Sequence, residues 1–142
     1  MEIPSLGVNV SIVGVAYKDN HWDLTWLGNN AGYLDGSAYP TWSGNSVMTG
    51  HVVDAAGAPG PFAYIKDLQI GDKVNIHFGG QVFIYEVREN RQVLPTMLST
   101  IFKHEDYNWL TLVTCEDYNN ARKGYNYRRF ARAVLVSVVP EK

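Results

Sequence analysis

The sequence predicts a mostly β, single-domain fold, a closed or nearly closed barrel of about eight strands with short helices in its loops. Three observations support this prediction. Alternating and β-branched segments recur at short intervals along the 142 residues, glycine and proline turns separate them, and helical periodicity is weak. The composition, 46% hydrophobic with 18% charged residues, is typical of a folded globular chain.

The strands can be placed from the amino end onward. The segments that alternate or are rich in β-branched residues are 8–17, 45–51, 73–78, 81–93, 109–115 and 128–139. The glycine pair at 79–80 separates two of them and predicts a two-residue hairpin. Short helices are expected at 62–68 and 96–102. The stretch 18–44, rich in glycine, asparagine and aromatic residues, is expected to be a long surface connection with a helical turn.

Charge and cysteine content exclude several classes of protein. A formal net charge of −2 leaves no broad basic surface, so nucleic-acid binding is not expected. One cysteine can form no intramolecular disulfide, and no paired-cysteine or HExxH pattern indicates a metal site. No apolar run reaches the roughly 18 residues that span a bilayer, and the start lacks a signal-peptide pattern. We therefore expect residues 1–142 to form one domain, the trimmed soluble part of a longer protein being one interpretation.

The only cysteine, Cys115, stands where an apolar strand pattern ends and a polar stretch begins, in "TLVTCEDYNN". A lone cysteine is often a small buried hydrophobe, whereas a reactive one needs a nearby base or cation. Its position favours a reactive thiol, because strand ends project residues into clefts where loops converge. Among the four histidines, His51 closes the strand pattern "GNSVMTGH" before a Gly/Pro-rich loop. It is the candidate base, although a structural role is open for it as well.

The candidate cation comes from the arginine-rich pattern "YRRFARAVLV". Strand alternation places Arg128 and Arg132 on one face and Arg129 on the other. Arg128 opens the strand and is therefore best placed to reach a cleft. The alternative is that Arg129 and Arg132 lie on the solvent face near acidic loops.

Together these motifs resemble those of the sortases, a family of cysteine transpeptidases. "TLVTC" matches the TLxTC signature, "GNSVMTGH" resembles the segment that ends in the active-site histidine, and "YRRFARAVLV" resembles the arginine motif. The resemblance covers nearly the whole domain, with the three motifs in family order. It implies a sortase-like barrel in which Cys115 is the nucleophile, His51 the general acid/base and Arg128 the oxyanion- and substrate-stabilising residue. The family's spacing favours Arg128 over Arg129.

The resemblance also implies a reaction. Sortases cut an LPxTG-like C-terminal sorting signal in secreted proteins and join the new carboxyl end to an amine of a peptidoglycan precursor or a pilin lysine. They act at the extracytoplasmic face of the cell membrane, and we expect no anchor of the kind that they usually carry within residues 1–142. By resemblance the loops 94–108 and 116–127 wall the substrate groove. The residues expected to line it, or alternatively to fill the barrel end, are Leu94, Pro95, Leu98 and Ile101.

No cofactor is expected. Some family members bind calcium through loop carboxylates, and that option is open here although the spacing is not that of an EF-hand. The carboxylates concerned are Glu105, Asp106, Glu116 and Asp117. Two other functions are open: a non-catalytic β-barrel peptide-binding module with a buried, inert Cys115, and a hydrolytic cysteine peptidase. Thiol reactivity separates an inert cysteine from one in a cleft.

Overall fold

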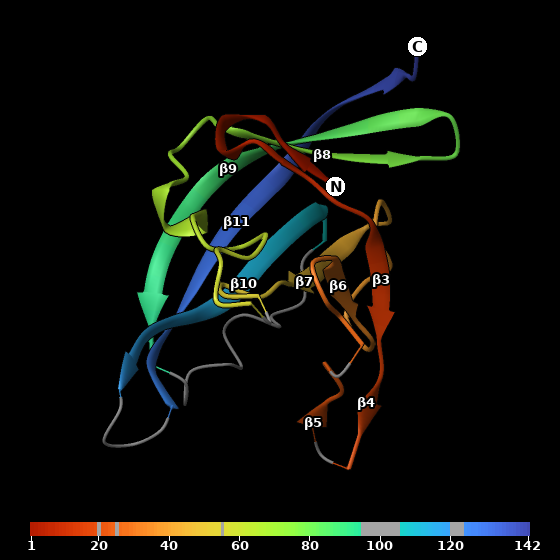
Figure 1. Ribbon diagram of the computed structural model, residues 1–142. Helices are drawn as coiled ribbons and strands as arrows, with labels where there is room; N and C mark the ends of the chain where they lie inside the picture. Colours follow the sequence, from red (N-terminus) through yellow and green to blue (C-terminus); the bar gives the residue numbers. More distant parts are fainter. Residues whose placement is uncertain (20, 25, 55, 95–105, 120–123) are drawn as a thin grey trace.

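The computed structural model describes residues 1–19, 21–24, 26–54, 56–94, 106–119 and 124–142, with the backbone alone described at 21, 115–119 and 124–126. Within these residues a nine-stranded sheet has the order β2-β1-β8-β9-β11-β10-β7-β6-β3. Figure 1 shows that the sheet curls strongly. Its two edge strands, β2 (Val8–Asn9) and β3 (Ile12–Val15), are joined through residues 10 and 11. The predicted mostly β, nearly closed barrel is therefore confirmed.

Short strands come first along the chain and long ones follow. The short strands are β1 (Glu2–Ile3), β2, β3, β4 (Tyr17–Lys18), β5 (His21–Trp22), β6 (Ala31–Leu34) and β7 (Gly44–Thr49). The later strands are β8 (Lys73–Phe78), β9 (Gln81–Val93), β10 (Asn108–Asn119) and β11 (Gly124–Pro140). Two 3₁₀ helices, η1 (Pro4–Leu6) and η2 (Ile65–Asp67), lie in the connections. Within the described residues no helix is long and apolar enough to cross a membrane.

Most of the predicted elements are present. The segments 73–78 and 81–93 coincide with β8 and β9, and the hairpin between them has Gly79 at φ 61° and Gly80 at φ 77°. Two consecutive positive φ values are what a two-residue hairpin of this kind requires, and glycine adopts them without strain. The predicted helix at 62–68 is reduced to η2, and the one at 96–102 lies outside the described residues.

The prediction for residues 18–44 was wrong in one respect. The stretch contains β6, which pairs in parallel with β3 and antiparallel with β7, so it contributes a strand to the main sheet. Four residues are too few to show a period-2 pattern, and the strand is defined by its two neighbours. The expected strand at 8–17 is likewise divided, because the chain leaves β2 at one edge of the sheet and enters β3 at the other.

Two apolar clusters pack on opposite faces of the central strands. The first fills the barrel, and its members from the long strands are Val74, Ile76, Tyr85, Val87, Leu110, Leu112, Ala131 and Ala133. The second contains Val47, Val93, Val113 and Phe130, together with Leu27 and Leu34 from the segment before β7. Since side chains alternate along a strand, Val113 and Leu112 necessarily face opposite ways. The central strands are thus apolar on both faces.

An ionic network attaches both ends of the chain to β8. His77 Nδ1 lies 2.6 Å from Glu141 Oε1, and its Nε2 lies 3.4 Å from Glu2 Oε1. Asn75 Nδ2 donates to the same Glu2 oxygen at 3.3 Å. The hydrogen bonds to Glu141 and Glu2 raise the pKa of His77, and those from Asn75 and His77 lower the pKa of Glu2. The first strand and the C-terminal segment are therefore both held to β8 by interactions with His77 whose strength depends on pH.

Candidate active site

The three predicted catalytic residues come from two paired strands and from the turn after a third. The prediction that a strand ends at Cys115 and another begins at Arg128 was wrong, because β10 continues to Asn119 and β11 begins at Gly124. Arg128 on β11 is the direct cross-strand partner of Cys115 on β10, and directly paired positions share a face of the sheet. On its other side β10 runs parallel to β7, and their last paired residues are Val113 and Thr49. Cys115 and His51 each come two residues after that last pair. The sheet therefore brings the three positions together in the order Arg128, Cys115, His51.

Two threonine side chains connect β10 to β7 at the end of their backbone ladder. Thr49 Oγ1 donates to the carbonyl oxygen of Val113 at 2.9 Å. Thr114 Oγ1, in the opposite direction, donates to the carbonyl oxygen of Gly50 at 3.0 Å, and this bond is buried. The second bond lies immediately before Cys115 on one strand and before His51 on the other. It fixes the spacing between the nucleophile's strand and the histidine's turn.

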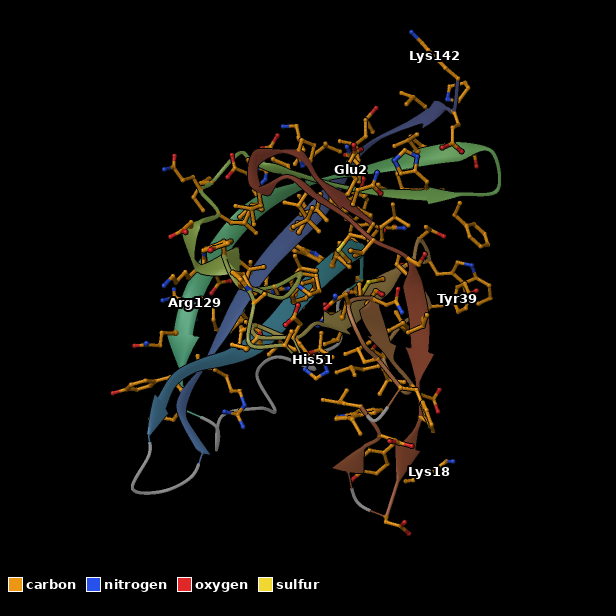
Figure 2. The ribbon with its side chains drawn as sticks, in the orientation of Figure 1. Glu2, Lys18, Tyr39, His51, Arg129 and Lys142 are labelled. Atoms are coloured by element: carbon orange, nitrogen blue, oxygen red, sulfur yellow. The ribbon has the colours of Figure 1, made fainter. Side chains whose placement is uncertain are left out.

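The backbone around His51 is closely packed. A Cβ at Gly50 would lie 2.7 Å from the ring of Phe62, which is fully buried, so only glycine fits there. Phe62 N donates to the carbonyl oxygen of His51 at 3.1 Å, and Gly60 N donates to that of Val52 at 2.9 Å. The loop after β7 thus folds back onto the histidine's own backbone. His51 is half-buried, and Figure 2 shows it near the centre of the view, close to β7.

The two candidate arginines have different surroundings. Arg128 is half-buried, and its Nη1 donates to the carbonyl oxygen of its neighbour Tyr127 at 3.2 Å. Arg129 belongs to the opposite face, where its Nη1 donates to Asn90 Oδ1 at 3.2 Å. The Asn90 amide in turn donates to carbonyl oxygens of η2 and of Leu68, at 2.8 Å for the latter. In Figure 2 Arg129 lies apart from His51, on the side of η2. The geometry therefore favours Arg128 as the cation beside Cys115, and its catalytic role stays a prediction.

Arg132, the other arginine on the Arg128 face, is held in structural contacts. Its guanidinium carbon lies 4.4 Å from the centre of the Trp109 ring, and its Nη1 lies 3.7 Å from Glu89 Oε2. Its side chain is only 17% exposed. The alternative that placed Arg132 on the solvent face is therefore wrong, because a cation–π contact and an ion pair cover it.

A cavity of about 90 Å³ adjoins His51 and is lined by residues from the end of β7, the turn after it, β10 and the segment before β6. We call it the His51 pocket. Its lining residues are Leu24, Leu27, Thr49, Gly50, His51, Val52, Val53 and Thr114. The pocket is mostly apolar, with the imidazole as its one titratable group among the lining residues.

The expected substrate groove is described only in part. Leu94 is 51% exposed and comes directly after Val93, which pairs with Arg128. Pro95, Leu98 and Ile101 lie outside the described residues, so their role in the groove stays a prediction. Of the carboxylates considered for calcium, Glu105 lies outside the described residues, and only the backbone is described for Glu116 and Asp117. Among the described residues, no group of three or more His, Cys, Asp or Glu side chains is placed to hold a metal ion.

Sequence reasoning missed the groups that hold the site together. In the sequence, Thr114 stands out only as part of the TLxTC signature, and its bond to Gly50 is not apparent. Leu24 and Leu27, which line the His51 pocket, belong to the stretch 18–44 that was expected to be a surface connection. One signal was available. A threonine in a buried strand needs an acceptor for its hydroxyl, and alternation places Thr114 on the face opposite Cys115.

A nearly closed β-barrel with a cysteine and an arginine paired on adjacent strands, and a histidine just after a third strand, is the framework of a sortase-type transpeptidase. The Sortase domain model matches residues 1–136, and the chain belongs to the sortase family. A search among curated proteins gave no match.

Solved sortase structures agree with this assignment. The Clostridium perfringens sortase D5 transpeptidase is 27% identical, with a TM-score of 0.73 over 96% of this chain and 76% of that one. A lid mutant of Corynebacterium diphtheriae sortase A is 26% identical, with a TM-score of 0.76 over 95% and 67%. Streptococcus pneumoniae sortase C-3, at 22% identity, has a TM-score of 0.78 over 98% and 62%, which shows the shared fold.

Proposed function

We propose that this sortase-family chain cleaves an LPxTG-like sorting signal and joins the new carboxyl end to an amine through a thioester on Cys115. The observation that supports this most directly is the cross-strand pairing of Cys115 with Arg128. A thiol nucleophile needs a positive group near the developing oxyanion and a proton carrier within reach. The bond from Thr114 to Gly50 holds the turn of His51 beside the same part of β10.

In the first half of the reaction the Cys115 thiolate attacks the threonine carbonyl of the signal. A C–S bond forms, and the carbonyl electron pair moves to oxygen to give a tetrahedral oxyanion. The always-charged guanidinium of Arg128 stabilises that oxyanion, an interaction whose loss typically lowers the rate about 10²–10³-fold. The oxyanion collapses, the bond between threonine and glycine breaks, and His51 donates a proton to the departing amine.

In the second half an amine attacks the thioester carbonyl. His51 accepts the proton that the amine loses, the C–S bond breaks and the Cys115 thiolate leaves. The products are a new amide bond and the original enzyme. Water in place of the amine would give hydrolysis, so the yield of transfer depends on how well the amine is held.

The partners and the place of action are proposed from family membership. We propose that the substrates are secreted proteins with the signal at their C-terminus, and that the acceptor is a peptidoglycan precursor or a pilin lysine. The reaction then anchors surface proteins at the extracytoplasmic face of the membrane. Leu94, exposed and next to the residue that pairs with Arg128, is placed to contact the apolar part of the signal.

The test is incubation with a library of LPxTG-like peptides and either a glycine or a lysine amine, followed by mass spectrometry. We expect a ligated product and a thioester adduct, both lost in Cys115→Ala. The arginines supply a matched pair. Arg128→Lys should lower the rate about 10²-fold by misplacing the oxyanion donor, whereas Arg129→Lys should lower stability and leave the rate near wild type.

Other results would lead to other functions. Cleavage without transfer at saturating amine would indicate a hydrolytic cysteine peptidase. No adduct, together with a folded-state thiol that resists alkylation, would indicate a binding module with an inert cysteine. Equal loss of rate in the two arginine variants would contradict the role given to Arg128.

A further inference from the structure

We propose that an exposed group of four aromatic side chains, at the end of β7 away from His51, is a docking surface for a proline-rich polypeptide segment that carries a basic residue. We call this group the aromatic platform; its members are Tyr33, Tyr39, Trp42 and Phe78. The inference goes beyond the proposed function and does not depend on it. It is supported by the exposure and packing of the rings, by the backbone that presents them and by the charge around them.

Three parts of the chain supply the platform. Tyr33 belongs to β6, Tyr39 and Trp42 to the loop between β6 and β7, and Phe78 ends β8 beside the hairpin. Trp42 stands two residues before the first residue of β7, and His51 stands two residues after the last. The six residues of β7 span roughly 20 Å when extended. In Figure 2 Tyr39 accordingly lies at the right-hand edge of the molecule, apart from His51, so a partner bound there leaves the candidate active site open.

The rings of the platform contact one another, and three of them are largely exposed to solvent. The centre of the Tyr39 ring lies 5.3 Å from that of Trp42, 6.4 Å from that of Phe78 and 5.7 Å from that of Tyr33. The exposed fractions of Trp42, Phe78 and Tyr39 are 65%, 51% and 45%. Rings that serve only to fill a core are covered, whereas an exposed group of large apolar side chains marks a binding surface.

The backbone that presents Trp42 is strained and is held by two other strands. Thr41 has φ 75°, a left-handed conformation that is unfavourable for a β-branched residue. Asn108 Nδ2, at the start of β10, donates to the carbonyl oxygen of Thr41 at 2.9 Å. On β9, burial raises the pKa of Tyr85 to about 12, and a hydrogen bond with the Thr41 backbone lowers that pKa in part. Strained backbone persists only where its surroundings fix it, and such positions are concentrated where ligands bind.

The angles between the rings favour prolines over a flat partner. The ring planes of Trp42 and Phe78 are inclined to that of Tyr39 by 52° and 73°. Faces inclined in this way cannot all lie against one flat surface. The pyrrolidine rings of a polyproline II segment, by contrast, project in three directions around its axis. Such segments dock on aromatic side chains, and they lose little entropy because they are extended before they bind.

The charge around the platform favours a basic residue beside the prolines. The segments that build and hold the platform contain two aspartates, one histidine that two glutamates contact, and no lysine or arginine. These segments are 33–45, 75–81 and 106–108. Burial raises the pKa of Tyr33, and so does the nearby carboxylate of the exposed Asp35. A basic side chain of the partner can pair with Asp35 or lie over a ring, whereas anionic lipid headgroups are repelled.

The first experiment measures binding to the wild-type chain by fluorescence anisotropy. The probe is a fluorescein-labelled peptide of eight prolines followed by two arginines. We expect saturable binding that is at least about tenfold weaker when alternating glycine and serine replace the prolines, because that peptide is disordered and lacks the rings. Replacing the arginines with glutamates should weaken binding about fivefold or more. Failure of the probe to bind, or equal binding of the glycine–serine peptide, would overturn the inference.

Two exposed tryptophans supply a matched pair of variants. Trp42→Ala removes an aromatic anchor and should weaken binding of the probe at least about tenfold. Trp26→Ala, at a residue that is 87% exposed and outside the platform, should leave the affinity unchanged. Phe78→Ala, at the hairpin, is a second change within the platform and should also weaken binding, with the urea midpoint of unfolding measured for each variant. Equal affinities of the two tryptophan variants would contradict the platform.

A further variant tests the charge. Asp35→Asn should weaken binding of the arginine probe about twofold to fivefold, which is the effect of one exposed ion pair, and leave binding of a probe without arginines unchanged. Equal effects on the two probes would contradict the basic residue in the partner.

Other occupants of the platform would be detected in the same assay. The competitors are an N-acetylglucosamine hexasaccharide and phosphatidylglycerol vesicles. If either binds with a dependence on Trp42 while the proline probe does not bind, the inference is overturned and the platform recognises a glycan or a membrane instead.

Discussion

Replacing Thr114 with valine tests whether one buried hydroxyl holds β10 and the turn of His51 together. Valine has nearly the same shape, so the change leaves no cavity and removes only the 3.0 Å bond to the Gly50 carbonyl. Thr114 is 7% exposed and Gly50 is buried, so water does not replace the lost donor. An unsatisfied buried acceptor costs about 1–3 kcal/mol. We expect the urea midpoint of unfolding to fall by about 1 M.

The same variant should lose activity, because the bond fixes the spacing between Cys115 and His51. A misplacement of about 1 Å can lower a rate about 10²-fold, so we expect a loss of roughly tenfold or more in the transfer assay. Thr114→Ser keeps the hydroxyl and should recover most of the rate. The readout is kcat/KM for transfer beside the free energy of unfolding for each variant.

Thr111→Val is the matched control on the same strand. The Thr111 hydroxyl also bonds across to the neighbouring strand, with Asn45 Oδ1 at 2.6 Å. It lies four residues before Cys115, which is roughly 13 Å along an extended strand and therefore away from the site. Thr111→Val should lower stability by a similar amount and leave the rate of the folded enzyme near wild type. A normal rate in Thr114→Val, or an equal loss of rate in both variants, would refute the reasoning.

Three further predictions concern other parts of the fold. Gly50→Ala should destabilise by about 1–3 kcal/mol through contact with the Phe62 ring, measured by urea unfolding; wild-type stability would show that the ring moves aside. Asn90→Ala should lower the unfolding midpoint because η2 loses its bonds to β9, whereas Asn90→Asp should restore none of them, since a carboxylate cannot donate. His77→Gln should lower the thermal midpoint most at pH values between the lowered pKa of Glu2 and the raised pKa of His77. The raised pKa of His77 makes its contribution fade as the pH rises through that pKa, and the lowered pKa of Glu2 makes its contribution fade as the pH falls through that pKa. A difference in thermal midpoint between His77→Gln and the wild type that does not vary with pH would contradict the ionic interactions of His77 with Glu2 and Glu141.

The sequence by itself determined most of the barrel. Alternation and β-branching located β8 and β9 at their observed bounds, and the glycine pair located the hairpin between them. These features are local, because the alternation of side chains along a strand and the positive φ values of a turn depend on consecutive residues. The motif "TLVTC" and its resemblance to the sortases likewise led to the family that the Sortase domain match shows.

Only the tertiary structure decided how separate segments meet. The strand β6 exists through its two neighbours, the pairing of Cys115 with Arg128 depends on the register of β10 and β11, and the bond from Thr114 to Gly50 joins residues 64 positions apart. The His51 pocket likewise takes its walls from three segments distant in the chain. A periodic pattern specifies which face a residue takes, but the partner on that face is set by register and by the closure of the sheet, which no local pattern contains.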